Sequence, residues 1–178
     1  MRKQLEVPYY AQVGGNTCWK AVAKMVLEYM GLLITFNERE SDPEGSAVNL
    51  LMEETKSPNF VADNSPFPEW DDIKNEIDAD RLLIGCVADK PTKTRDLEVT
   101  GGHWIIISGY EESGNKIYVL DPFREFGSFL MDCPTLVGNG YCYQPYPDYD
   151  ARYFQSTSYM PEKWNLSLKG QVSDGEIY

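Results

Sequence analysis

The two halves of this chain carry different apolar patterns, and their order constrains the fold more than any other feature. From about Cys18 to Met30 apolar residues recur at helical spacing, and the same spacing returns in Gly45–Thr55 and in a shorter stretch around Trp70–Ile77. Continuous apolar runs typical of buried strands follow at Arg81–Ala88, His103–Tyr110 and Ile117–Leu120. Helices followed by strands predict an α+β fold, with a helical half packed against an antiparallel sheet.

The first helix is expected to be central, because most of its turns are apolar. Asn16 or Thr17 is placed to cap its start, and Gly31 is the residue expected just past its end. Its solvent-facing edge is expected to carry Lys20, Lys24 and Glu28, which follow one another at intervals of four.

The strands are expected to pair as neighbours. Glu111–Asn115 is a turn signal that predicts a hairpin between the second and third apolar runs, and one more strand is expected near Ser128–Met131. With 178 residues the chain is long enough to bury a core of its own, so we expect one domain over residues 1–178.

The charge balance excludes some partners. With 16 basic and 28 acidic residues the net charge is −12, which disfavours binding to nucleic acid or to an anionic membrane surface. Solubility explains such acidity simply, and steering of cationic substrates is the alternative. No run approaches the ~20 apolar residues of a membrane span. The first ten residues lack the apolar segment of a secretory signal, so we expect a cytoplasmic protein, or one exported with a cleaved or different leader.

Cysteine spacing gives no metal motif. The chain has four cysteines without a C-x-x-C pair and a single histidine, so neither a zinc site nor another cofactor is expected. Cys133 and Cys142 are close enough in sequence to form a disulfide, and the pattern leaves that open, whereas Cys18 and Cys86 are expected to remain thiols.

One of these cysteines occupies a reactive position. The small polar loop Gln12–Thr17 ends at Cys18, in the first turn of the predicted central helix, where unsatisfied N–H groups and the helix dipole favour a thiolate. Gln12 offers an amide donor upstream, so an oxyanion could be stabilised beside a nucleophile. A buried, inert helix cysteine is the competing interpretation.

A base and its partner follow in the strand region. His103 begins a strand behind two glycines, and Asp121 ends the next strand. Because a hairpin joins these strands, the two side chains are expected side by side, with the carboxylate orienting the imidazole. Taken singly, a structural histidine and an Asp-Pro turn explain them equally well.

The order Gln12, Cys18, His103 and Asp121 resembles the papain-like cysteine peptidases. The similarity is greatest to the short bacterial branch related to bacteriocin-leader peptidases and to some secreted effector proteases. It rests on VPYYAQVGGNTCWKAVAKMVLEYMG and GGHWIIISGYEESGNKIYVLDPF, with IKNEIDADRLLIGCVAD as a weaker match. The resemblance implies a papain-like fold, Cys18 as nucleophile, His103 as general base, Asp121 as its orienting group and Gln12 in the oxyanion hole. Asp80 departs from the pattern, because a glycine would end its helix more comfortably.

These residues predict hydrolysis of peptide bonds in a peptide or protein substrate. Acyl transfer to an amine, as in transglutaminases or acyltransferases, would use the same residues, and a catalytically idle binding module is the non-enzyme alternative. Trp19 and Trp104 flank the candidate site, as core residues or as part of a subsite. The polar stretch Asp89–Thr100 is expected to be a solvated loop before it is a substrate contact.

Overall fold

The computed structural model describes residues 1–42, 45–56, 68–89, 102–133, 136–137, 140–141 and 149–156. Within these ranges the chain forms three helices, α1 (Cys18–Tyr29), α2 (Ala47–Thr55) and α3 (Trp70–Asp78). The long strands are β2 (Leu83–Asp89), β3 (Gly102–Glu111), β4 (Lys116–Asp121), β5 (Gly127–Asp132) and β8 (Tyr149–Ser156). The short strands are β1 (Arg2–Gln4), β6 (Leu136–Val137) and β7 (Gly140–Tyr141). The predicted α+β class is confirmed, and apart from the short strand β1, which precedes α1, the strands follow the helices as predicted.

The main sheet is antiparallel and centred on β3. Its order is β5-β4-β3-β2-β8, and β1 pairs with the end of β3 beyond the part that pairs with β2. The predicted hairpin between β3 and β4 is present, with Gly114 and Asn115 at positive φ in its turn. β6 and β7 form a separate two-stranded ladder.

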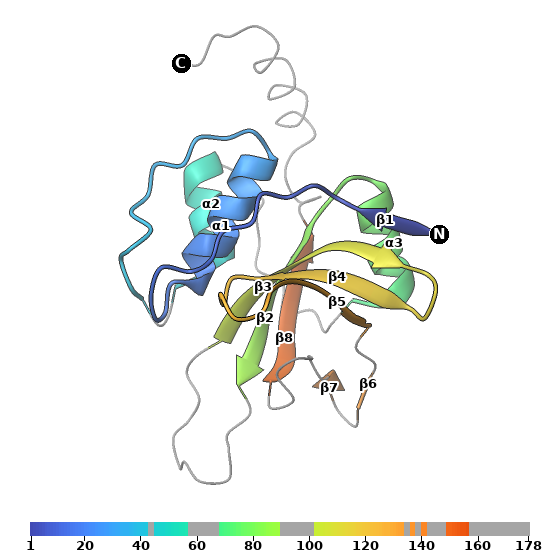
Figure 1. The fold of residues 1–178 in the computed structure, drawn as a ribbon. Coiled ribbons are helices and arrows are strands. Elements are labelled where there is room, and N and C mark those ends of the chain that lie inside the picture. The colour runs from blue at the N-terminus through green and yellow to red at the C-terminus, as the bar shows by residue number, and fades with distance from the viewer. Residues whose placement is uncertain are drawn as a thin grey trace, which may run out of the picture.

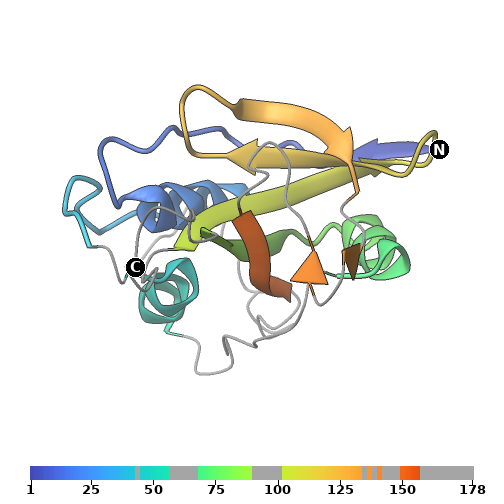
Figure 2. The ribbon, with the colours of Figure 1, turned by 90° about the horizontal axis from the view of Figure 1, so that it is seen from below.

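The helices lie at two ends of this sheet. α1 and α2 pack together beside one end and α3 lies beside the other, in both views of the ribbon (Figure 1, Figure 2). The face that α1 turns inward includes Val22, Met25 and Val26, which are completely buried, as are Ile105 and Ile107 of β3. Burial of each such side chain contributes roughly 1.5–3 kcal/mol, so this layer holds α1, and with it Cys18, at a fixed place over the sheet.

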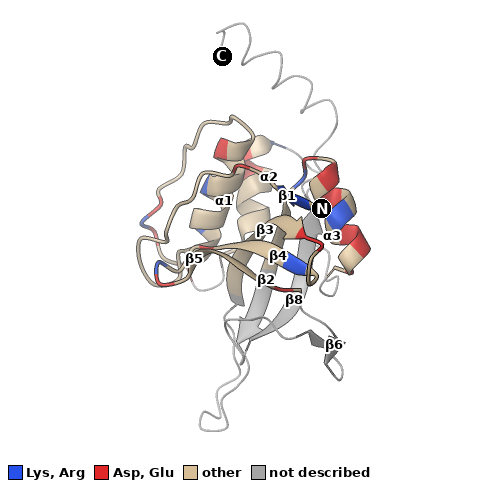
Figure 3. Ribbon diagram, turned by 45° about the vertical axis from the view of Figure 1, so that its right-hand side comes forward, with Lys and Arg blue, Asp and Glu red and all other residues tan. Residues whose placement is uncertain are grey.

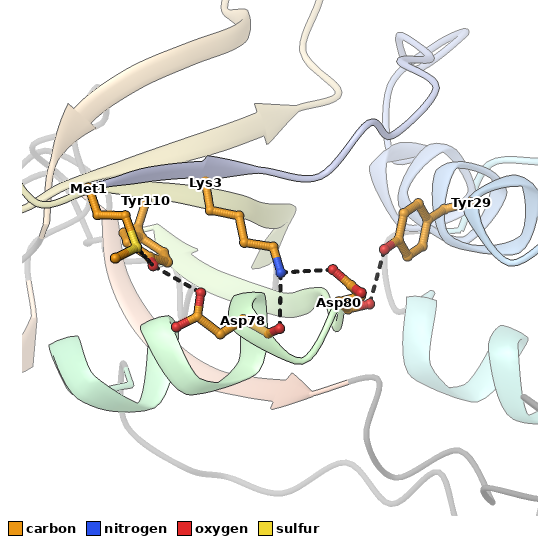
Figure 4. Close-up of polar contacts among 6 residues, drawn as sticks. All are labelled: Met1, Lys3, Tyr29, Asp78, Asp80 and Tyr110. Carbon is orange, nitrogen blue, oxygen red and sulfur yellow. Dashed lines mark hydrogen bonds and ion pairs between the residues drawn. The ribbon is translucent and has the colours of Figure 1, made fainter.

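A network of polar contacts ties the start of the chain to both groups of helices (Figure 4). Lys3 Nζ donates to the Asp78 carbonyl at 2.9 Å and pairs with Asp80 Oδ1 at 2.8 Å. The hydroxyl of Tyr110 donates to Asp78 Oδ1 at 2.9 Å, and that of Tyr29, at the end of α1, donates to the Asp80 carbonyl at 3.0 Å. The network joins β1, the end of α3 and the end of α1.

Glycine is required where β1 meets β3. A Cβ on Gly109 would lie 2.6 Å from the Lys3 carbonyl oxygen and 2.7 Å from Gln4 Cα, distances that backbone atoms cannot accommodate. The β3–β4 register also shifts between Ile107 and Gly109, which marks a bulge. From β1 the chain then runs across to α1 at the other end of the sheet (Figure 1).

The ends of the helices agree with the sequence in part. Gly31 follows α1 at φ 74°, as expected for a residue just past the end of a helix. Asp80, where a glycine would be more comfortable, adopts φ 57°. The second helix begins at Ala47, two residues later than predicted, because the side chain of Ser46 caps it by accepting from the N–H of Asn49.

The sequence predicts that Lys20 lies on the solvent-facing edge of α1, and this prediction is wrong, because Lys20 is only 2% exposed. The chain after α1 folds back over this edge, and Lys20 Nζ donates to the Asn37 carbonyl at 2.6 Å and pairs with Glu40 Oε2 at 3.1 Å. A flexible lysine can be buried when its ammonium group is paired and hydrogen-bonded in this way.

No helix in the described ranges is long and apolar enough to cross a membrane. The basic and acidic residues are spread over the helices, the turns and the connection between α1 and α2 (Figure 3).

Candidate active site

The loop before α1 is organised around one carbonyl group. The Gly14 oxygen accepts hydrogen bonds from Gln12 Nε2 at 3.0 Å and from Thr17 Oγ1 at 2.9 Å, and the same hydroxyl accepts from the Gly14 N–H. Asn16 adopts φ 57°, a left-handed conformation that asparagine tolerates better than most residues. These contacts turn the chain sharply into the helix.

Cys18 is the first residue of α1 and is 7% exposed. Thr17 is the N-cap residue, but its side chain bonds back to the loop and caps no N–H of the helix. The positive end of the helix dipole therefore acts on the thiol without a side-chain acceptor at the cap. A cysteine in the middle of a helix would lie away from this positive end.

Gln12 begins the loop that leads to Cys18, and a hydrogen bond fixes the orientation of its side-chain amide. Its nitrogen donates one hydrogen to Gly14, which leaves a second N–H, while its oxygen is buried and has no hydrogen-bond partner in the described part of the chain. A buried amide oxygen without a partner costs free energy, and such groups occur where function retains them.

The sheet brings His103 and Asp121 together. In the β3–β4 register Leu120 faces Ile106, so Asp121 falls opposite Ile105, and His103 lies two positions further along the same face. His103 Nε2 is 2.7 Å from Asp121 Oδ1, and the carboxylate is completely buried. This contact leaves Nδ1 as the nitrogen that can face Cys18.

Asp121 is held from both sides. Its Oδ1 also accepts from the Phe123 N–H at 2.8 Å, and its backbone oxygen accepts from the Tyr9 hydroxyl at 3.0 Å. The next residue, Pro122, accepts from the Gln12 N–H at 2.8 Å. The segment that carries Gln12 is thus bonded directly to the segment that carries Asp121.

The environment of His103 changes its charge state. Burial lowers the pKa of the imidazole, but hydrogen bonds and charge interactions with Asp121 and Cys18 outweigh it and raise the pKa to about 9. The imidazole is therefore mainly protonated near neutral pH, which places a positive charge beside Cys18.

This charge state gives a prediction for Asp121→Asn. Because His103 is the only histidine, its ring gives one set of imidazole NMR signals, whose titration reads its pKa directly. We expect a midpoint near 9 in the native protein and a lower one in Asp121→Asn, because the negative charge that raises the pKa is removed. Cys18→Ala should lower the midpoint as well, since the contact with Cys18 also raises it.

The sign of the accompanying change in stability follows from the same shift. The ordinary pKa of histidine is 6.5, so between about 6.5 and 9 the folded state binds more protons than the unfolded state. The contribution of His103 to the free energy of unfolding is present in full below about pH 6.5 and is lost as the pH rises through 9. A native midpoint at or below 6.5 would contradict the arrangement.

The two tryptophans beside the site meet at one glycine. The Trp19 ring covers Gly45 so closely that a Cβ there would lie 2.1 Å from it, and Trp104 Nε1 donates to the Gly45 carbonyl at 3.2 Å. Trp104 is almost completely buried and Trp19 partly so. Both therefore pack the segment before α2 against the site.

Most of the polar stretch Asp89–Thr100 lies outside the described residues, as does Cys142, the partner considered for Cys133.

Sequence reasoning missed the supporting contacts of Tyr9, Thr17 and the Phe123 N–H. The Tyr9 hydroxyl donates to the backbone oxygen of Asp121, and the Phe123 N–H donates to the Asp121 carboxylate. No spacing in the sequence predicts such bonds. In the described ranges no group of three or more His, Cys, Asp or Glu side chains is placed to hold a metal ion.

Comparison with known proteins identifies the family. The model of the Peptidase_C39 like family matches residues 4–145, which include Gln12, Cys18, His103 and Asp121. The chain belongs to this family, and with it to the papain-like cysteine peptidases. Family membership indicates cysteine peptidase activity and a peptide or protein substrate.

A solved structure shows the same fold. The crystal structure of a candidate C39-like peptidase from Bacillus anthracis superposes with a TM-score of 0.51. The two sequences are 11% identical, and the alignment covers 85% of this chain and 97% of the other. A comparison with proteins of curated function gave no significant match.

Proposed function

We propose that the protein hydrolyses peptide bonds through an acyl-enzyme on Cys18. The observation that carries the proposal is the placement of His103 between Asp121 and Cys18: its Nε2 is 2.7 Å from the Asp121 carboxylate, and Cys18 is close enough to raise the pKa of the imidazole. A nucleophile, a base within hydrogen-bond reach of it and a third group that orients the base are the parts that covalent acyl transfer needs.

Acylation uses the pair in its ionised form. The Cys18 thiolate attacks the scissile carbonyl carbon, and the carbonyl π electrons move to the oxygen to give a tetrahedral oxyanion. As the oxyanion collapses, the C–N bond breaks and the His103 imidazolium gives its proton to the departing nitrogen. The products of this step are a free amine and a thioester on Cys18.

Deacylation reverses the role of the base. Neutral His103 takes a proton from water, the hydroxide attacks the thioester, and collapse releases a carboxylic acid and the Cys18 thiolate. Asp121 keeps Nε2 of the ring occupied throughout, so Nδ1 exchanges the proton at the reacting face.

The oxyanion is stabilised by donors that are already in place. The second N–H of Gln12 and the backbone N–H of Cys18 at the start of α1 are the two candidates. Both are fixed before substrate arrives, Gln12 by Gly14 and Cys18 by the helix, and preorganised donors of this kind typically contribute about 3–4 kcal/mol to transition-state binding.

A labelling experiment combined with a cleavage assay tests the proposal. Near neutral pH iodoacetamide should modify Cys18 faster than the other three cysteines, read out by peptide mapping. Cys133 is the internal comparison, because burial raises the pKa of its thiol to about 11 and leaves little thiolate. The same reagent should abolish cleavage of a complex peptide mixture in step with the labelling of Cys18.

The products distinguish hydrolysis from transfer. Hydrolysis gives fragments with new amino and carboxyl termini, whereas acyl transfer incorporates an added amine such as glycinamide, which mass spectrometry detects. Equal labelling of Cys18 and Cys133, or cleavage that continues after complete labelling of Cys18, would rule out the proposed role of the thiol.

A further inference from the structure

The chain between α1 and α2 is fastened to α1 by two ion pairs on alternate residues. Lys24 Nζ pairs with Glu38 Oε1 at 2.8 Å, and the buried Lys20 pairs with Glu40 Oε2 at 3.1 Å. Both glutamates are thereby drawn toward the helix, and both of their charges are compensated. Arg39 lies between them and is exposed.

Arg39 lines an open depression of about 660 Å³ together with Ser41 and the loop residues Val13, Gly14, Gly15, Asn16 and Thr17. Its guanidinium forms no ion pair with a carboxylate of the residues that the structure describes, and its two chain neighbours, Glu38 and Glu40, are paired with lysines. The depression therefore has an exposed positive charge on one wall, in a protein of net charge −12.

This depression adjoins the candidate nucleophile. Its lining ends at Thr17, the residue bonded to Cys18, and includes Gly14, to which Gln12 donates. The wall that carries Arg39 is tied to the loop, since Ser41 Oγ donates to the Gly15 carbonyl at 3.0 Å and the Asp42 N–H donates to that of Asn16 at 3.3 Å. A Cβ placed on Gly14 or Gly15 would meet nothing within 4 Å, so the space over the loop is open.

We propose that Arg39 determines specificity by binding an acidic side chain of the substrate close to the scissile bond. The inference rests on the proposed peptidase function and deepens it by naming the substrate class. An arginine presents a planar fork of donors that matches a carboxylate, and the pairing of both neighbouring glutamates leaves that fork available.

The negative net charge of the protein makes the positive charge of Arg39 more important for binding an acidic substrate. A protein of net charge −12 repels acidic peptides at long range, so an acidic side chain is accepted near Cys18 only if a cation meets it there. Arg39 supplies that cation at the edge of the depression. Peptides with neutral residues at this position would bind without its help.

The first test uses no substrate. Cys18 is alkylated with iodoacetate, which is negatively charged, and with iodoacetamide, which is neutral, and the ratio of the two rates is measured at low salt. We expect Arg39→Gln to lower the ratio about threefold, because the charge that attracts iodoacetate is gone. Lys116→Gln is the matched control: it removes one positive charge at the far end of β4, roughly 17 Å along the strand from Asp121.

The second test measures specificity. In a proteome-derived peptide mixture, cleavage sites of the native protein should be enriched in Asp or Glu at one position near the cut. Arg39→Gln should lose that enrichment while cleaving neutral sequences at the native rate, and Arg39→Glu should favour Lys or Arg there.

The outcomes separate the two proposals. Cleavage with the same residue preference in Arg39→Gln, or an alkylation ratio that falls equally in Lys116→Gln, overturns the role of Arg39 and leaves the peptidase function standing. A native protein that cleaves no peptide, with Cys18 no more reactive than Cys133, overturns the peptidase function and this inference with it.

Discussion

Replacing Cys18 with alanine is expected to lower kcat/KM for peptide hydrolysis by a factor of about 10⁴ or more, to the level set by binding and the oxyanion donors alone. In the proposed mechanism the thiol sulfur forms the thioester, and alanine provides no nucleophile in its place. Cleavage of a peptide identified with the native protein measures the effect.

The fold should survive this substitution. Cys18 is at the first position of α1, where alanine is well tolerated, and removing one buried sulfur atom costs roughly 1 kcal/mol. Circular dichroism should be unchanged, and the urea midpoint should shift only slightly. Cleavage at the native rate by this well-folded variant would show that the reaction does not use Cys18.

Replacing His103 with alanine is expected to have the second largest effect, a loss of about 10³-fold in kcat/KM. In the proposed mechanism the variant lacks the proton donor for the leaving amine, and it also lacks the positive charge beside Cys18. Two readouts should therefore fall together, the rate of peptide cleavage and the rate at which iodoacetamide labels Cys18 near pH 7.

A second substitution separates these effects. Gln12→Ala removes a proposed oxyanion donor and leaves the contact between His103 and Cys18 in place. It should therefore slow cleavage while Cys18 is labelled at close to the native rate. If His103→Ala is labelled as fast as the native protein, the imidazole does not control the state of the thiol.

Much of the architecture could be predicted from local patterns. The helical spacing after Cys18 gave the first helix to within about a residue, and the apolar runs gave the central strands β2, β3 and β4. Adjacent antiparallel strands joined by a short turn place their outer ends side by side, so the neighbourhood of His103 and Asp121 followed from the hairpin. These elements carry their own signal because each buries a regular set of apolar side chains.

What the sequence did not predict depends on contacts between distant segments. β1 is a strand of three polar residues, Arg-Lys-Gln, whose place is set by the edge of β3. β8 carries charged and polar residues along its length, so periodicity does not distinguish it from a loop. Lys20 has the spacing of an exposed residue, and its burial became visible only with the chain that folds over it.

The bonds between the Tyr9–Gln12 segment and residues 121–122 also bear on how the protein folds. Tyr9 and Asp121 are 112 positions apart, so this bond closes a loop that includes all three helices and the centre of the sheet. Contacts of such long sequence separation form late, because the entropy of loop closure must be overcome before they contribute. This connection sets the position of Gln12 relative to Asp121, so we expect the candidate site to take its final geometry late in folding.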